Sequence, residues 1–228
     1  MIAAGFDISS STGICIMDGS RPIHVEAWRA NIPRPKDLGP MEANAEYESA
    51  LAEPFRKHVR GLLKQYGVQF GAYEQPRTRD FERKITHVDT AAEWAGQAIT
   101  TETQRASSNL SMLRSFGMCV IVHGLCRNLG IPCYEVPADE WRKAFIGRAR
   151  APKTDNAGRP IKDGRKWLKN QVVEQCRLEG INVPNDDAGD AVGVTFWLRA
   201  RLSPIGRARA GDLFSQPVPN TAKKEFPF

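Results

Sequence analysis

The sequence predicts an α/β fold with a mixed sheet, and two observations carry that prediction. The first is a run of apolar strands at residues 2–8, 14–17 and 23–28, joined by the turn SSSTG and the hairpin signal Asp18-Gly19. The second is that later short apolar strands alternate with helical patterns. Strands in hairpins pair antiparallel and strands joined by helices usually pair parallel, so one sheet should contain both.

After the three strands, a helix is indicated by apolar residues at helical spacing, with Gly67 as its end. Pro54 lies inside that pattern, so the helix either begins near Glu53 or kinks there. A short buried strand follows at residues 68–73 and ends on Glu74.

The remaining elements are shorter or more polar. We expect a short helix and a connection in the Thr- and Ser-rich stretch before Asn109, and then a long helix capped within 107–109 that runs to Asn128. Further elements follow in order: strand 132–136, helix 137–145, loop 147–164, helix 165–179 and helix 186–202. Residues 1–202 should form one domain, and residues 203–228, rich in proline and small polar residues, a loose tail.

Composition fits one globular domain, since the chain has 228 residues of which 41% are hydrophobic. No basic start leads into an apolar segment, and the longest apolar run is too short to span a membrane, so we expect a soluble cytoplasmic protein with no membrane partner. The five cysteines include no CxxC pair, which argues against a disulfide framework and against a zinc site.

Positive charge is concentrated in one segment. Residues 142–169 hold ten Lys or Arg and only two acids, so they carry a net +8 within a chain whose net charge is +6. A one-sided basic stripe of this kind is typical of a polyanion-binding surface, although a solvated loop would also be charged.

The acidic residues at element ends suggest a catalytic site. Asp7 ends the first strand and is followed by a hydroxyl-rich turn, a pattern found both in metal-dependent nucleases and in ATPases or sugar kinases. Asp187 and Asp190 are three residues apart and share one face of the last helix. Helix capping would explain Asp186 or Asp187, but not Asp190, which lies among apolar residues.

With Glu74 at the end of the strand at 68–73, the candidate acids are Asp7, Glu74, Asp187 and Asp190. If these four carboxylates came together, they would repel one another and raise each other's pKa. Divalent cations remove that cost, because Mg²⁺ prefers oxygen ligands. Two such ions about 3.5–4 Å apart can assist phosphodiester displacement by stabilising both the attacking and the leaving oxygen.

In this order, the motifs resemble those of the RuvC-type Holliday-junction resolvases, particularly their phage-borne members, within the RNase H-like and retroviral-integrase superfamily. The matching segments are GFDISSSTG, YEQP, EVPADEWRKAFIG and DDAGDAVGVTFW, and the match covers roughly residues 1 to 200. In the last segment, Asp187-Ala-Gly-Asp190-Ala matches the acid-x-x-Asp-Ala helix of the family. If the match to this motif is shifted by one residue, Asp186 takes the place of Asp187 as its first acid.

The resemblance implies an RNase H-like fold with a five-stranded mixed sheet flanked by helices, usually as a homodimer. It implies that Asp7, Glu74, Asp187 and Asp190 bind two Mg²⁺ or Mn²⁺ ions. The implied substrate is four-way or branched DNA in a bacterial or phage-infected cell, cut to leave a 5′-phosphate and a 3′-hydroxyl.

The family also places basic residues near the scissile phosphate, and Lys166 is the first choice for a catalytic lysine. Exposed aromatic and basic residues in the loop after Glu74 and in the basic stripe are the expected DNA contacts: Phe81, Arg77, Arg79, Arg142, Lys143, Lys153 and Lys169. Phe81 can stack on a junction base or, alternatively, anchor its loop to the core.

Other functions stay open at this stage. An actin-like or sugar-kinase-type ATPase needs a second phosphate hairpin and a glycine-rich adenosine loop, and the sequence shows no second DxGxT pattern. A DNA-binding module without catalysis would have no reason to keep four acids. An RNase H-like nuclease acting on RNA–DNA hybrids fits the same acids and the same basic stripe. The helix from 107 to 129 is the expected dimer interface.

Overall fold

The computed structural model describes residues 1–9, 11–33, 40–76, 82–87, 100–105, 109–154 and 157–203. Its centre is a five-stranded sheet in the order β3-β2-β1-β4-β7. The strands are β1 (Ile2–Asp7), β2 (Thr12–Asp18), β3 (Arg21–Trp28), β4 (Phe70–Glu74) and β7 (Cys133–Val136). The first three strands pair antiparallel, whereas β4 pairs parallel with both β1 and β7. The predicted α/β fold with a mixed sheet is therefore confirmed.

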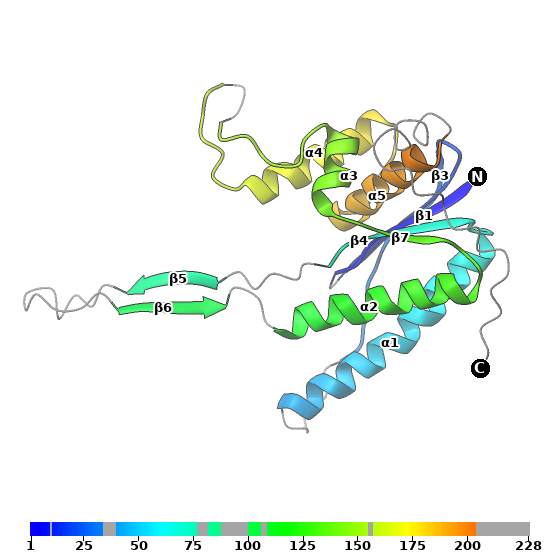
Figure 1. Cartoon of the computed structure of the whole chain (residues 1–228), viewed down its shortest axis with the longest axis horizontal. Coiled ribbons are helices and arrows are strands. Elements are labelled where there is room, and N and C mark those ends of the chain that lie inside the picture. The colour runs from blue at the N-terminus through cyan, green and yellow to red at the C-terminus, as the bar shows by residue number, and fades with distance from the viewer. Residues whose placement is uncertain are drawn as a thin grey trace, which may run out of the picture.

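Helices cover both faces of this sheet (Figure 1). One face packs against α1 (Pro40–Gln65) and α2 (Asn109–Asn128), and the other against α3 (Ala138–Ile146), α4 (Gly164–Leu178) and α5 (Asp186–Leu202). Side chains alternate along each strand, so Ala4 and Phe6 of β1 pack toward α1 and α2, while Ala3 packs toward α5. By the same alternation, Asp7 at the end of β1 belongs to the α5 face.

Most predicted elements are present with ends within a few residues of the prediction, and α5 has the predicted bounds. Helix α1 begins at Pro40 and runs through Pro54, so it does not begin near Glu53. The expected short helix in the Thr- and Ser-rich stretch is wrong for the described residues there, which form the antiparallel hairpin strands β5 (Glu82–His87) and β6 (Thr100–Arg105). Figure 1 shows this hairpin extending away from the sheet.

Helix α5 lies very close to the sheet because the strands beneath it carry glycines. A Cβ atom added at Gly5 would stand 2.3 Å from the Thr195 hydroxyl oxygen, and one added at Gly13 would stand 1.9 Å from the Asp187 carbonyl oxygen. Real Cβ atoms essentially never approach this closely, so only glycine fits at these two positions. The helix that carries two of the predicted acids is thereby held directly against the strand that carries Asp7.

Within the described residues, no helix combines the length and the apolar character that a membrane span needs. The predicted tail beyond residue 203 lies outside the described residues.

Candidate active site

The four predicted acids come together at one edge of the sheet. Asp7 and Glu74 end the neighbouring parallel strands β1 and β4, and Asp187 and Asp190 lie on the first turns of α5. Parallel strands end at the same edge, and α5 crosses that edge, so the chain positions all four side chains without any long loop.

Burial and the neighbouring acids raise the pKa of two of these carboxylates. Burial raises the pKa of Asp7 well above its usual value, and the charges of Glu74, Asp190 and Asp187 raise it further. The pKa of Asp190 is raised to about 7, mainly by burial and in addition by the charges of Glu74 and Asp187. Asp7 and Asp190 therefore lie among carboxylates that repel them, and we call Asp7, Glu74, Asp187 and Asp190 the acidic cluster; its role as a metal site stays a prediction.

Two basic side chains border this acidic cluster. The Arg142 guanidinium, on α3, lies 3.7 Å from Glu74 Oε2 and 3.8 Å from Asp190 Oδ2. Lys169, on α4, bonds to Asp186 and has its Nζ 3.5 Å from Asp187 Oδ1. Both cations lower the pKa of Asp190, so they offset part of the repulsion.

Trp141 contacts the acidic cluster, a contact that the sequence reasoning missed. Its indole Nε1 donates to Glu74 Oε2 at 2.8 Å, and its side chain is fully buried. The ring lies over Gly193 of α5, where an added Cβ would stand 2.5 Å from it. Trp141 therefore fixes the Glu74 carboxylate relative to α5, and the EWRK segment contains both this residue and Arg142.

The predicted DNA-contacting residues, together with the predicted catalytic Lys166, fall into three groups. Arg142 and Lys169 reach the acidic cluster, whereas Lys143, Lys153 and Lys166 are exposed. Lys166 lines a groove along α4, and its backbone N–H donates to the N-cap Asp163. The amine that borders the acids is thus that of Lys169, one helical turn beyond Lys166, and a catalytic role for Lys166 stays a prediction. Phe81, Arg77 and Arg79 lie outside the described residues.

The cluster has the chemistry of a site for hard divalent cations. All four side chains offer carboxylate oxygens, and Asp190 Oδ1 is buried without a hydrogen-bond partner. An unpartnered buried carboxylate oxygen is costly unless a cation or a donor meets it. As they stand, no three His, Cys, Asp or Glu side chains in the described ranges converge enough to hold a metal ion, and Arg142 and Lys169 supply the nearby positive charge instead.

Comparison with known proteins bears on the fold. No protein-family model matches the sequence, and no curated protein matches it. Among solved structures, RuvC of Thermus thermophilus in complex with a Holliday junction substrate is 15% identical, with a TM-score of 0.50 and coverage of 92% of this chain and 96% of that chain. The chain has the RuvC fold.

Two further solved structures are similar. A second structure of Thermus thermophilus RuvC is 11% identical, with a TM-score of 0.48 and coverage of 88% of this chain and 94% of that chain. The yeast mitochondrial Holliday junction resolvase is 12% identical, with a TM-score of 0.47 and coverage of 86% and 77%. On the RuvC fold of this chain, the four acids occupy the edge of the sheet where β1, β4 and α5 meet.

Proposed function

We propose that the protein is a metal-dependent endonuclease that cuts branched DNA, with the four-way junction as its preferred substrate. The observation that carries this proposal is the cluster of Asp7, Glu74, Asp187 and Asp190 at the sheet edge, bordered by Arg142 and Lys169. The predicted RuvC-type resemblance and the RuvC fold point to the same reaction class, and a bound junction is part of one solved structure with this fold.

The four acids would hold two Mg²⁺ or Mn²⁺ ions. When bound, such ions supply a water-derived nucleophile and neutralise charge on the phosphate in the transition state. This chain's own residues do the rest: Trp141 orients Glu74, Arg142 stands beside Glu74 and Asp190, and Lys169 offers a cation at the outer edge of the acids. Cleavage would leave a 5′-phosphate and a 3′-hydroxyl.

The basic stripe supports DNA as the substrate. Its exposed members Arg148, Arg150 and Lys153 follow α3 in the segment that leads to α4, and α4 itself borders the acids. Phosphates neutralised along this stripe would release counterions, so binding should weaken steeply as salt rises.

The test is cleavage of an end-labelled four-way junction in Mg²⁺, with linear duplex, a replication fork and an RNA–DNA hybrid in parallel and Asp190→Asn as the inactive control. We expect symmetric paired nicks in the junction that DNA ligase can seal, since sealing requires a 5′-phosphate and a 3′-hydroxyl. Preferential cleavage of the hybrid would assign an RNase H-like activity to the same acids. Turnover of ATP without cleavage of any nucleic acid would refute the proposal.

Paired nicks require two active sites, so we also propose a homodimer with C₂ symmetry. Helix α2 presents Leu113, Phe116 and Val120 with exposed fractions of 61%, 37% and 68%. These residues are three and four positions apart, so they form one exposed apolar stripe, which is the kind of surface that a second copy would cover.

Val120→Glu in α2 is expected to convert the dimer to a monomer, because a buried unpaired carboxylate would be costly at a subunit interface. Sedimentation velocity checks the mass, and the junction assay checks whether paired nicks become single nicks. Leu178→Glu, an equally exposed leucine on α4, is the matched control and should stay dimeric. A wild-type protein that sediments as a monomer with and without DNA would contradict the dimer.

A further inference from the structure

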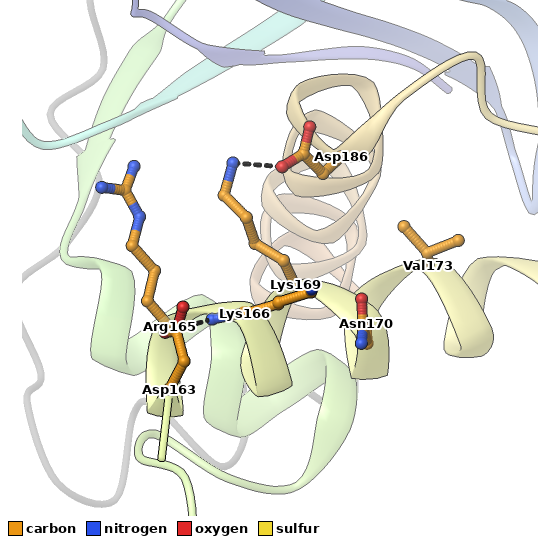
Figure 2. A pocket seen from close by; sticks show the side chains of 7 residues that line it. All are labelled: Asp163, Arg165, Lys166, Lys169, Asn170, Val173 and Asp186. Atoms are coloured by element: carbon orange, nitrogen blue, oxygen red, sulfur yellow. Dashed lines mark hydrogen bonds and ion pairs between the residues drawn. The ribbon is translucent and has the colours of Figure 1, made fainter. Parts of the chain in front are cut away.

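A groove runs along the first turns of α4 (Figure 2). One of its lining residues, Lys169, has its Nζ 3.5 Å from Asp187 Oδ1 of the acidic cluster. Arg165, Lys166 and Lys169 line it, together with two aspartates, Asp163 and Asp186. The side chains of Lys169 and Asp186 point toward each other across the gap between α4 and α5.

Asp186 stands apart from the four acids of the cluster. The largest acidic contributions to the raised pKa of Asp7 come from Glu74, Asp190 and Asp187, and those acting on Asp190 come from Glu74 and Asp187. Asp186 is 42% exposed at its side chain, compared with 17% for Asp187 and 5% for Asp190. Its register at the helix start therefore leaves it outside the cluster, and its carboxylate has a different partner.

That partner is Lys169, whose ammonium lies between Asp186 and Asp187. The hydrogen bond from Lys169 lowers the pKa of Asp186. Burial alone would lower the pKa of Lys169, but the bond and the nearby acids raise it. Lys169 is thus held by Asp186 where the basic groove reaches Asp187.

We propose that Asp186 is a positioning residue for Lys169: in the DNA-free protein it holds the ammonium at the edge of the acidic cluster, and an incoming DNA phosphate takes its place. This inference rests on the proposed nuclease function and deepens it by assigning a role to an acid outside the predicted set. The pair is partly exposed, with Asp186 on its more open side, and such pairs contribute little net free energy, so a charged phosphate oxygen can displace Asp186.

The exchange predicts how charge removal affects DNA binding. In Asp186→Asn, Lys169 has lost its competing partner, so the junction should bind about 2- to 5-fold tighter in EDTA, where no cleavage occurs. The salt dependence should also become steeper, because in the wild type the freed Asp186 recovers a counterion that partly cancels the counterion release at Lys169. Fluorescence anisotropy with a labelled junction at four salt concentrations measures both quantities.

A double-mutant cycle separates this exchange from general electrostatics. In a Lys169→Met background, the gain in junction affinity caused by Asp186→Asn should fall to the gain caused by Asp163→Asn, which is the matched control. Asp163→Asn removes the same charge from the same groove, and asparagine keeps the N-cap bond to the Lys166 backbone N–H. Thermal melts of each variant show that all are folded.

The outcomes are distinct. A gain in Asp186→Asn that survives unchanged in the Lys169→Met background, or that equals the gain in Asp163→Asn, overturns the inference. If the wild-type protein binds no branched DNA at all, the proposed function itself fails. If the protein binds and cleaves a junction but the two mutations have additive effects on affinity, the proposed nuclease function holds and only the role of Asp186 is refuted.

Discussion

Asp7→Asn is expected to abolish DNA cleavage while making the metal-free protein more stable. In the proposed metal site, loss of the Asp7 carboxylate would remove several kcal/mol of transition-state stabilisation, so cleavage should fall by about 10³-fold or more. Stability should rise because burial and the charges of Glu74, Asp190 and Asp187 all disfavour the charged form of Asp7 in the folded protein.

The expected gain is about 1–2 kcal/mol, or about 2–8 °C in Tm for a chain of this size. A carboxyl group with a raised pKa binds its proton more tightly in the folded state, so the wild type gains stability as pH falls. For the neighbouring Asp190, that gain develops between a pKa of about 7 and its usual value of 3.8. By the same sign, the advantage of Asp7→Asn should be largest at high pH, where Asp7 is charged in the folded protein, and should shrink as pH falls toward the usual pKa of an aspartate.

Differential scanning fluorimetry with EDTA and with Mg²⁺ measures these effects beside the junction assay. Mg²⁺ should raise the Tm of the wild type and have little effect on Asp7→Asn, since a ligand that binds the native state stabilises it. Asp18→Asn on β2 is the matched control, because Asp18 is 60% exposed and pairs only with the N-terminal ammonium at 3.4 Å in the described structure. A less stable Asp7→Asn protein at pH 8 in EDTA would show that the acids do not repel one another as the structure indicates.

The acids themselves could be predicted from the sequence because each stands at a place that the strand and helix patterns fix. Asp7 and Glu74 end apolar strands, and Asp190 interrupts an apolar helix. The choice between Asp186 and Asp187 rested on the three-residue spacing and stays a prediction; in the structure Asp187 raises the pKa of Asp7 and Asp190, whereas Asp186 pairs with Lys169.

Contacts between distant elements could not be predicted in this way. Lys166 and Lys169 lie on the same helix face, and only the packing of α4 on α5 decides that Lys169 borders the acids. The sequence alone predicts an ordinary core residue at Trp141, and only the structure shows that its indole N–H donates to Glu74. Strands β5 and β6 lack the alternation of apolar and polar residues that marks a half-buried strand. They extend away from the core (Figure 1), so neither face of the hairpin needs apolar side chains.

Gly13→Ala is expected to reduce both stability and cleavage, because it would move the helix that carries Asp187 and Asp190. The added Cβ would stand 1.9 Å from the Asp187 carbonyl oxygen and 2.9 Å from the Ala188 nitrogen. These are backbone atoms of α5, so they cannot move aside as the end of a flexible side chain could. The helix would have to move away from β2, and with it the two acids it brings to Asp7.

Overpacking at such a contact typically costs about 1–3 kcal/mol, and a displacement of about 1 Å at a catalytic group can cost about 10²-fold in rate. Urea denaturation and the junction assay measure the two losses. Gly61→Ala in α1 is the matched control, because its added Cβ meets no atom within 4 Å outside the adjacent backbone of its own helix. Alanine favours a helix more than glycine does, so this variant should be as active as the wild type and no less stable. If Gly13→Ala cleaves junctions at the wild-type rate, the close approach of α5 to β2 does not set the position of the acids.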